Sequence, residues 1–288
     1  MKLPAFEYVA PDTLAEALAL LQARGDDARP IAGGQSLIPV LAFRLAQPAL
    51  LVDLRKLPGL DRIAISEQGV SLGALVRWCD IEADTRLRAA HPLLVAAVAQ
   101  IAHYQVRNRG TVGGSLAHGD AAAELPGIAV TCDAEIVAAG PSGTRTIPAE
   151  DFFLAPLMTA LAQGELVIEL RLPPWPARRR WAFEEFARQR GAFALAGIAL
   201  FYDERDGIVM NTHIGVIGAS SRPHRLAGAE AAVNGRAMNE ATIAVAACAA
   251  AAGVDPSGDL EASAAYRRAL VGTLVERALN IAAKRTAA

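Results

Sequence analysis

Two glycine-rich stretches constrain this chain more than any other feature. The first is Ile31-Ala-Gly-Gly-Gln-Ser-Leu-Ile-Pro39, and the second, about 80 residues later, is Thr111-Val-Gly-Gly-Ser-Leu-Ala-His-Gly-Asp120. Each places two glycines between a short apolar run and a hydroxyl residue. Paired glycines allow positive φ and a close approach of the backbone to a ligand. Successive N–H groups followed by a helix N-terminus attract anions. We therefore predict that both stretches hold one phosphate-bearing ligand.

Several other classes of phosphate-binding protein are excluded by motif and charge. The sequence contains no G-x-x-x-x-G-K-[ST] motif, which argues against a P-loop NTPase, and no G-x-G-x-x-G motif after a strand, which argues against a Rossmann site. The formal net charge of −2 gives no support to a nucleic-acid-binding role. A pyrophosphate would be held mainly by backbone N–H groups and hydroxyls.

The two stretches resemble the FAD-pyrophosphate loops of one family. The family is the flavoprotein (medium) subunit of molybdenum-containing hydroxylases, of the xanthine dehydrogenase and aerobic carbon monoxide dehydrogenase type. The similarity runs nearly from end to end, and further matching segments are Phe6-Glu-Tyr8, Leu51-Val-Asp-Leu54, Ala123-Glu-Leu-Pro126, Phe183-Glu-Glu-Phe186 and Arg190-Gly-Ala-Phe-Ala194. The resemblance implies an α+β protein with a vanillyl-alcohol-oxidase (PCMH)-type FAD-binding fold. Two α/β subdomains would be followed by a three-stranded antiparallel sheet with a helical bundle.

Local patterns predict three units, at residues 1–56, 57–175 and 178–288. In the first unit, helices at 12–24 and 36–45 alternate with strands at 29–32 and 50–54, a βαβ arrangement with the first glycine pair before its second helix. A capping box at Thr13 and Glu16 begins the first helix, and Gly25 ends it. The second unit has predicted hairpins at 62–72 and 134–147, two or three helices across 76–103, a helix at 123–131 and a strand at 165–172. After a proline-rich linker at 173–176 and a basic run at 178–180, strands at 181–188, 193–202 and 208–218 precede helices at 226–234, 239–252 and 262–285.

The expected FAD contacts come from both stretches and from two later positions. They are Ala32, Gly33, Gly34, Gln35, Ser36, Leu37, Thr111, Gly113, Gly114, Ser115, His118, Asp120, Leu161 and Phe193. The resemblance implies that Asp120 accepts a hydrogen bond from a sugar or ribityl hydroxyl, and that Leu161 and Phe193 lie near the flavin ring.

Several of these positions also have a purely structural interpretation. Ser36 and Ser115 are alternatively helix N-caps, and Asp120 is alternatively a cap on the following helix. Arg107 and Arg109 are expected to form ion pairs with surface acids in preference to binding phosphate. Three positions depart from the usual family residues, namely Ser115 in place of Asn, Ala121 in place of Pro and Ala192 in place of an acid. We expect no catalytic acid, base or metal ligand.

The cofactors of the whole complex are expected to be divided between chains. Cys79, Cys132 and Cys248 are widely spaced and include no C-x-x-C pair, so this chain should hold no iron–sulfur cluster of its own. The resemblance implies a large molybdenum–pterin subunit, a small subunit with two [2Fe–2S] clusters, and a dimer of heterotrimers. FAD would pass the electrons to an external acceptor. The substrate would be carbon monoxide, an N-heterocycle such as nicotine or purine, or an aldehyde.

Two other functions remain open at this point, a stand-alone flavin oxidoreductase of the same fold and a non-catalytic assembly subunit. The N-terminus lacks the apolar core of a signal peptide, and the Ala-rich run at 241–253 is too short to span a membrane. With no pair of neighbouring cysteines, the sequence predicts a cytoplasmic protein without an integral membrane segment.

Overall fold

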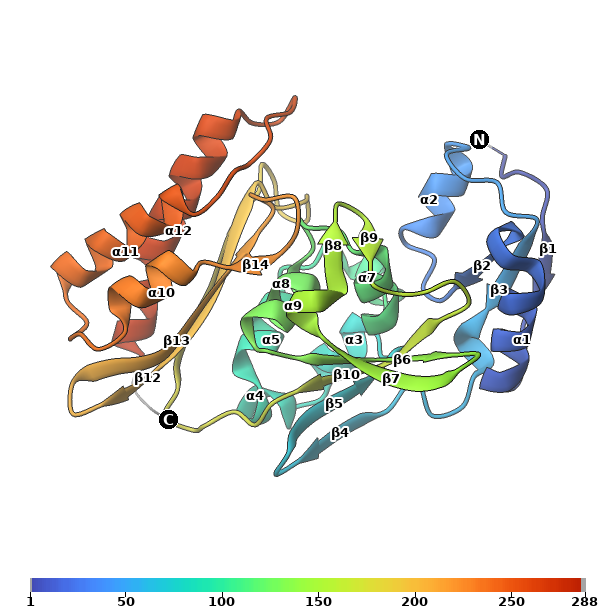
Figure 1. The fold of residues 1–288 in the computed structure, drawn as a ribbon, viewed down its shortest axis with the longest axis horizontal. Coiled ribbons are helices and arrows are strands. Elements are labelled where there is room, and N and C mark those ends of the chain that lie inside the picture. The colour runs from blue at the N-terminus through green and yellow to red at the C-terminus, as the bar shows by residue number, and fades with distance from the viewer. Residues whose placement is uncertain (1, 286–288) are drawn as a thin grey trace.

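The computed structural model describes residues 2–285 as three successive units (Figure 1). The first unit is a parallel sheet in the order β1-β3-β2, formed by β1 (Glu7–Val9), β2 (Ala28–Ile31) and β3 (Leu50–Asp53). The helices α1 (Leu14–Arg24) and α2 (Leu37–Ala42) connect these strands, and two 3₁₀ turns follow at Gly25–Asp27 and Leu54–Lys56. The predicted βαβ arrangement is confirmed, whereas β1 was not predicted.

Helix α1 begins and ends as its sequence predicts. The Thr13 side chain accepts a hydrogen bond from the Glu16 N–H at 3.2 Å, and Gly25 ends the helix with φ of +52°. Ala17 and Leu21 face inward and are buried against β2 and β3. Local capping therefore sets the ends of this helix, and its apolar stripe packs against β2 and β3.

The second unit is a five-stranded antiparallel sheet in the order β4-β5-β10-β6-β7. Its strands are β4 (Ile63–Ser66), β5 (Gly69–Gly73), β6 (Glu135–Gly140), β7 (Gly143–Pro148) and β10 (Leu166–Leu172). The helices of this unit are α3 (Trp78–Ala83), α4 (Leu87–Ala90), α5 (Pro92–Val98), α6 (Tyr104–Arg107), α7 (Val112–His118), α8 (Glu124–Thr131) and α9 (Ala149–Phe152). A small hairpin of β8 (Phe153–Ala155) and β9 (Met158–Thr159), which was not predicted, lies beside α7.

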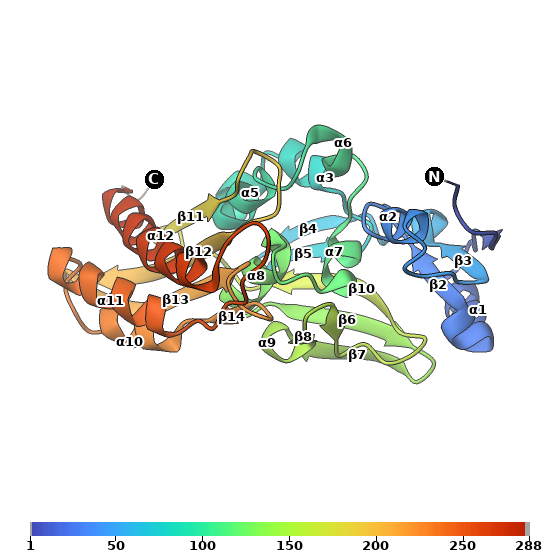
Figure 2. The same cartoon turned by 90° about the horizontal axis from the view of Figure 1, so that it is seen from above.

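The third unit is a four-stranded antiparallel sheet covered on one face by helices (Figures 1 and 2). Its strands are β11 (Arg180–Phe186), β12 (Ala196–Arg205), β13 (Ile208–Ile217) and β14 (His224–Arg225). The covering helices are α10 (Ala227–Val233), α11 (Glu240–Ala252) and α12 (Ala264–Lys284). The three predicted strands are confirmed, and the two-residue β14 adds a fourth. The predicted strand at 193–202 begins only at Ala196, so Phe193 lies in the preceding loop.

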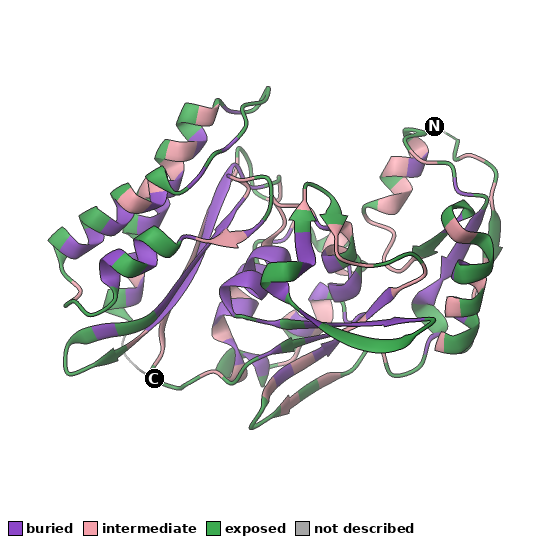
Figure 3. Cartoon of the chain, in the orientation of Figure 1, coloured by how far each residue is buried: buried purple, intermediate pink, exposed green. Residues whose placement is uncertain are grey.

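The long sheet of the third unit has two buried faces (Figure 3). Ala196, Ile198 and Leu200 of β12 pack with the helices of their own unit. Ala199 and Phe201, which alternate with them, join the core of the second unit. Because both faces are covered, β12 is buried throughout from Ala196 to Tyr202.

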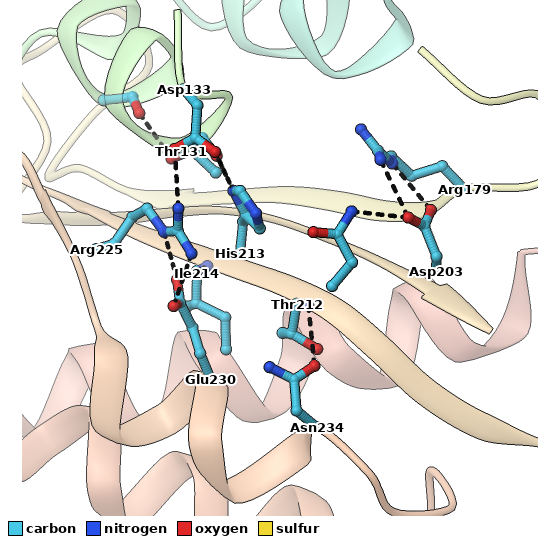
Figure 4. Close-up of polar contacts among 12 residues, drawn as sticks. Thr131, Asp133, Arg179, Asp203, Thr212, His213, Ile214, Arg225, Glu230 and Asn234 are labelled. Atoms are coloured by element: carbon cyan, nitrogen blue, oxygen red, sulfur yellow. Dashed lines mark hydrogen bonds and ion pairs between the residues drawn. The ribbon is translucent and has the colours of Figure 1, made fainter. Parts of the chain in front are cut away.

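Polar contacts connect the second and third units at the end of α8 (Figure 4). Arg225 binds Asp133 at 2.8 Å and Glu230 at 2.8 Å, and His213 Nδ1 lies 2.8 Å from the Thr131 carbonyl oxygen. The segment predicted as a linker is also packed, because the Arg179 guanidinium lies 4.2 Å from the centre of the Phe201 ring. The third unit is therefore docked by specific contacts.

Two features are absent from the part of the chain that the structure describes, a membrane-crossing helix and a metal-binding cluster. Residues 2–285 contain no helix that is long and apolar enough to cross a membrane. They also contain no group of three His, Cys, Asp or Glu side chains arranged to hold a metal ion.

Candidate functional site

The first glycine stretch leaves a run of backbone N–H groups without partners. It connects β2 to α2, and Gly34 has φ of +73°, which favours glycine at this position. Among the described residues, none accepts a hydrogen bond from the N–H groups of Gly33, Gly34, Gln35, Ser36 or Leu37. The Ser36 hydroxyl makes no capping bond to α2 either. An anion placed here would meet several unused donors at once.

The second glycine stretch is a helix and not a loop, which corrects the prediction. Thr111 caps α7, and its side chain accepts the Gly114 N–H at 3.1 Å. The N–H groups of Val112, Gly113 and Ser115 donate to the carbonyls of Val76, Ala74 and Thr111. Ser115 lies inside the helix, so the alternative that it is an N-cap is wrong. The backbone donors at this helix start are already used.

The first stretch touches Arg109 and Gly110, the two residues that directly precede the second stretch. A Cβ added to Gly33 would lie 2.0 Å from the Arg109 carbonyl oxygen and 3.0 Å from Gly110 Cα. The Arg109 Nε also donates to the Gly33 carbonyl at 3.3 Å, and the Gln35 side-chain amide donates to the same oxygen at 3.2 Å. Gly33 is therefore required by a backbone contact, and Thr111 of the second stretch lines one cavity together with Ala32 and Gly33.

Two cavities lie on either side of this contact. The larger, of about 450 Å³, is lined by Ala32, Gly33, Arg55, Leu57, Asp61, Leu75, Arg77, Asp80, Asn108, Arg109 and Thr111. The smaller, of about 340 Å³, is lined by Gly33, Gly34, Gln35, Ile38, Pro39 and Arg109. Gly33 and Arg109 line both cavities, so an elongated ligand could cross from one to the other over this contact.

Only one of the three arginines in the larger cavity has no carboxylate partner among the described residues. Arg55 binds Asp53 at 2.6 Å and Arg77 binds Asp80 at 2.9 Å, and each carboxylate raises the pKa of its arginine. Arg109 makes its described hydrogen bond to a backbone carbonyl, so the expected ion pair with a surface acid is wrong for this residue. Its charge is available to a phosphate.

For Arg107 the expectation of an ion pair is confirmed. Its guanidinium lies 3.1 Å from Glu82 and also donates to the Ile101 and Ala102 carbonyl oxygens. These contacts fix the segment that leads into α6 and leave Arg107 no evident role in ligand binding.

The remaining predicted contacts lie outside these two cavities. The Asp120 carboxylate accepts the Ala122 N–H at 2.8 Å in the turn between α7 and α8, so it does not cap α8, whose N-cap is Ala123. His118 is the last residue of α7, and Leu161 packs partly buried against the core. Phe193 is 72% exposed in the loop before β12.

Two partly buried carboxyl groups, Glu124 near Asp120 and Glu185 on β11, were missed by the sequence analysis. Burial raises the pKa of Glu124 to about 7 and that of Glu185 to about 8. Glu185 Oε2 is buried and has no hydrogen-bond partner among the described residues. Glutamate normally lies at the surface, so no sequence signal distinguishes these two from the exposed ones.

Two family models together cover nearly the whole chain, one over the first two units and one over the third. Residues 4–175 match the family model described as the FAD binding domain in molybdopterin dehydrogenase, and residues 181–282 match the CO dehydrogenase flavoprotein C-terminal domain. The chain belongs to this family of FAD-binding medium subunits of molybdenum-containing dehydrogenases. The predicted α+β FAD-binding fold is confirmed.

Similar proteins cover essentially the whole chain. The chain is 41% identical to the 6-hydroxypseudooxynicotine dehydrogenase complex subunit alpha of Paenarthrobacter nicotinovorans, over 97% of this chain and 95% of the relative. It is 38% identical to the carbon monoxide dehydrogenase medium chain of Hydrogenophaga pseudoflava, over 99% of each chain.

Solved structures agree with the same assignment. A chain in carbon monoxide dehydrogenase from Hydrogenophaga pseudoflava superposes with a TM-score of 0.95 at 40% identity, over 98% of both chains. A chain in quinoline 2-oxidoreductase from Pseudomonas putida 86 gives 0.94 at 38% identity, over 99% of both. The chain is therefore an oxidoreductase subunit that binds FAD, in a family whose complexes carry molybdenum–pterin and iron–sulfur centres on partner subunits.

Proposed function

We propose that the FAD diphosphate binds across the contact between Gly33 and Arg109. The observation that carries this proposal is the run of five N–H groups, from Gly33 to Leu37, that have no partner among residues 2–285. The two cavities give the flavin nucleotide room on both sides of the contact. Arg109 then offsets part of the diphosphate charge.

The second stretch has a different part in this proposal. Because the N–H groups at the start of α7 are already bonded, Thr111 and Ser115 would act through their hydroxyls. Asp120 would accept from a sugar or ribityl hydroxyl with the oxygen that Ala122 does not use. The other predicted contacts keep their proposed positions along the cofactor, at Ala32, Gln35, Ser36, Gly113, Gly114, His118, Leu161 and Phe193. FAD supplies the capacity to accept electrons and to release them singly or in pairs.

The proposed complex is a heterotrimer, assembled as a dimer of heterotrimers. A small subunit with [2Fe–2S] clusters would deliver electrons to this chain, and a large molybdenum–pterin subunit would oxidise the substrate. An external acceptor would then take the electrons from FAD. We further propose the division into residues 1–56, 57–175 and 178–288, and a cytoplasmic location.

We infer the substrate class from the names of the relatives, because the candidate site on this chain does not determine it. The relatives are named for carbon monoxide, 6-hydroxypseudooxynicotine, nicotine, caffeine and glyceraldehyde. We propose that the substrate is carbon monoxide, an N-heterocycle or an aldehyde, and that the large subunit selects it. A stand-alone flavin oxidoreductase would instead oxidise an organic substrate without any partner.

The test is the visible spectrum of the full chain, purified alone and after co-expression with its neighbouring genes. Flavin absorbance should appear in the first preparation and disappear in the Gly33→Val, Gly114→Val double variant. Iron–sulfur absorbance and bound molybdenum should appear in the second. A chain that stays colourless in both preparations overturns the FAD assignment, and substrate oxidation by the chain alone overturns the proposed complex.

A further inference from the structure

The side chain of Arg267 is buried in the third unit and joins three segments that are distant in sequence. Arg267 lies near the start of α12 and is only 7% exposed. Its Nη1 donates to the carbonyl oxygens of Leu195 at 2.8 Å and Gly218 at 3.1 Å. Its Nη2 donates to the Asp259 carboxylate at 2.6 Å. One guanidinium therefore connects the loop between β11 and β12, the segment after β13, and the segment between α11 and α12.

Gly218 is the residue through which these contacts reach the second unit. Its N–H donates to the Ala121 carbonyl oxygen at 2.8 Å. A Cβ added to Gly218 would lie 2.6 Å from the Ala194 carbonyl oxygen, and its φ of +73° also favours glycine. Since its own carbonyl is bonded to Arg267, Gly218 is held at both ends of its backbone. It therefore fixes the position of Ala194 relative to Ala121.

Two of the proposed FAD contacts are the direct neighbours of these residues. Phe193 precedes Ala194, and Asp120 precedes Ala121. Ala194 and Leu195 are buried, whereas the Phe193 side chain is largely exposed. The backbone on one side of the Phe193 ring is thus fixed, while the ring itself is accessible to a planar ligand.

We propose that Arg267 is a positioning residue for the flavin end of FAD. It fixes the loop that carries Phe193 and, through Gly218, the turn that carries Asp120. Because Gly218 joins the neighbours of both residues, the hydroxyl that Asp120 binds belongs to the ribityl chain, next to the ring. The inference rests on the proposed FAD contacts. Arg267 acts only through other residues, since both its terminal nitrogens donate to protein oxygens.

The effect should be confined to the flavin end of the cofactor. The described residues that line the two cavities beside Gly33 and Arg109 include none from the three segments that Arg267 joins. The proposed diphosphate site therefore does not depend on Arg267. The planar guanidinium also suits this role, because it offers several donors in fixed directions, whereas lysine carries one ammonium group on a flexible chain.

The experiment titrates the flavin-free full chain with FAD and with ADP by calorimetry, because ADP has a diphosphate but no flavin. Arg267→Met should raise the Kd for FAD about tenfold, since one aromatic contact and one hydrogen bond are weakened. It should leave the Kd for ADP unchanged. Arg267→Lys should recover part of the FAD affinity. The matched control is Arg268→Met, which should bind both ligands as the wild type does, because Arg268 contacts Val254 and Asp255 instead.

A second variant reaches the same loop without changing Arg267. Gly218→Ala places its Cβ 2.6 Å from the Ala194 carbonyl oxygen, so it should weaken FAD binding and not ADP binding. Its control is Gly207→Ala, because Gly207 has a similar φ of +76° but nothing within 4 Å of an added Cβ. This control should leave both Kd values unchanged. If Arg267→Met fails to fold, this pair of variants gives the same test.

Hydrogen–deuterium exchange of the flavin-free chain separates this inference from the proposed function. Arg267→Met should speed exchange in peptides that cover residues 187–195 and 215–220, whereas Arg268→Met should not. If the wild type binds neither ligand but exchange rises in this way, the positioning by Arg267 is supported and the FAD site is not. Unchanged exchange, or an equal weakening of FAD and ADP binding by Arg267→Met, overturns the inference.

Discussion

Replacing Gly33 with alanine tests whether the first glycine stretch must lie directly against Arg109 and Gly110 for FAD to bind. The new Cβ would lie 2.0 Å from the Arg109 carbonyl oxygen and 2.7 Å from its carbonyl carbon. Unbonded heavy atoms prefer about 3.5 to 4.0 Å, so one backbone must move by more than 1 Å. Overpacking of this kind costs about 1–3 kcal/mol. We expect Gly33→Ala to lose about 2 kcal/mol of FAD binding free energy, roughly a thirtyfold higher Kd.

The assay is FAD titration of the flavin-free chain, well below the melting temperature, with circular dichroism to verify the fold. Gly228→Ala in α10 is the matched control, because nothing lies within 4 Å of its added Cβ. It should leave the Kd unchanged and stabilise the helix by about 0.5–1 kcal/mol. A Gly33→Ala protein that binds FAD within twofold of the wild type, with an unchanged melting temperature, refutes the argument.

Three further predictions concern charge and stability. Arg109→Met should raise the Kd for FAD by about tenfold or more, since bonds to charged groups contribute about 1.5–3 kcal/mol, whereas Arg88→Met, at an exposed position of α4, should not change it in the same titration. His91 is buried and its pKa is lowered to about 3 by desolvation, so the unfolding free energy should decline as pH falls below about 6.5. Melting from pH 7 to 4 should show a shallower decline in His91→Asn, and equal slopes would contradict this. Arg225→Met should cost about 3 kcal/mol in urea unfolding because Glu230 stays buried, while Arg205→Met, whose ion pair is exposed, should change it by less than about 1 kcal/mol.

Elements with strong local signals could be predicted from the sequence. The Thr13 cap, the apolar stripe of α1 and the C-terminal Gly25 all act within a few residues, and the structure confirms them. The strand β1 is different. It has only three residues, and its place in the sheet depends on pairing with β3, some 43 positions later. Nothing local distinguishes such a segment from a loop.

The candidate site could be predicted only in part. A sequence identifies the residue types, but it does not show which hydrogen bonds they form. The prediction that both glycine stretches hold one ligand stays a prediction, and it is supported by the cavity that Ala32, Gly33 and Thr111 line together. The conformation of the second stretch could not be anticipated, because its N–H groups bond to Val76 and Ala74 of a distant segment. The enclosure of Glu185 Oε2 likewise could not be anticipated, because Glu185 lies on β11, which pairs with the later strand β12.

The two Gly-Gly pairs therefore meet different physical requirements. Gly34 is required for its backbone conformation, Gly33 for its contact with Arg109, and Gly113 for its packing against Ala74, whose Cβ lies 2.6 Å from an added Cβ. Among the described residues, the first stretch keeps five consecutive unused N–H groups, whereas those of Val112 to Ser115 are bonded, so anion recognition is concentrated in the first stretch. The second stretch forms the helix α7, and its glycines allow this helix to lie close to β5 and β10 of the second unit. Gly110, which directly precedes α7, lies against Gly33. A substitution that disrupts the packing of α7 should therefore shift the first stretch and weaken ligand binding.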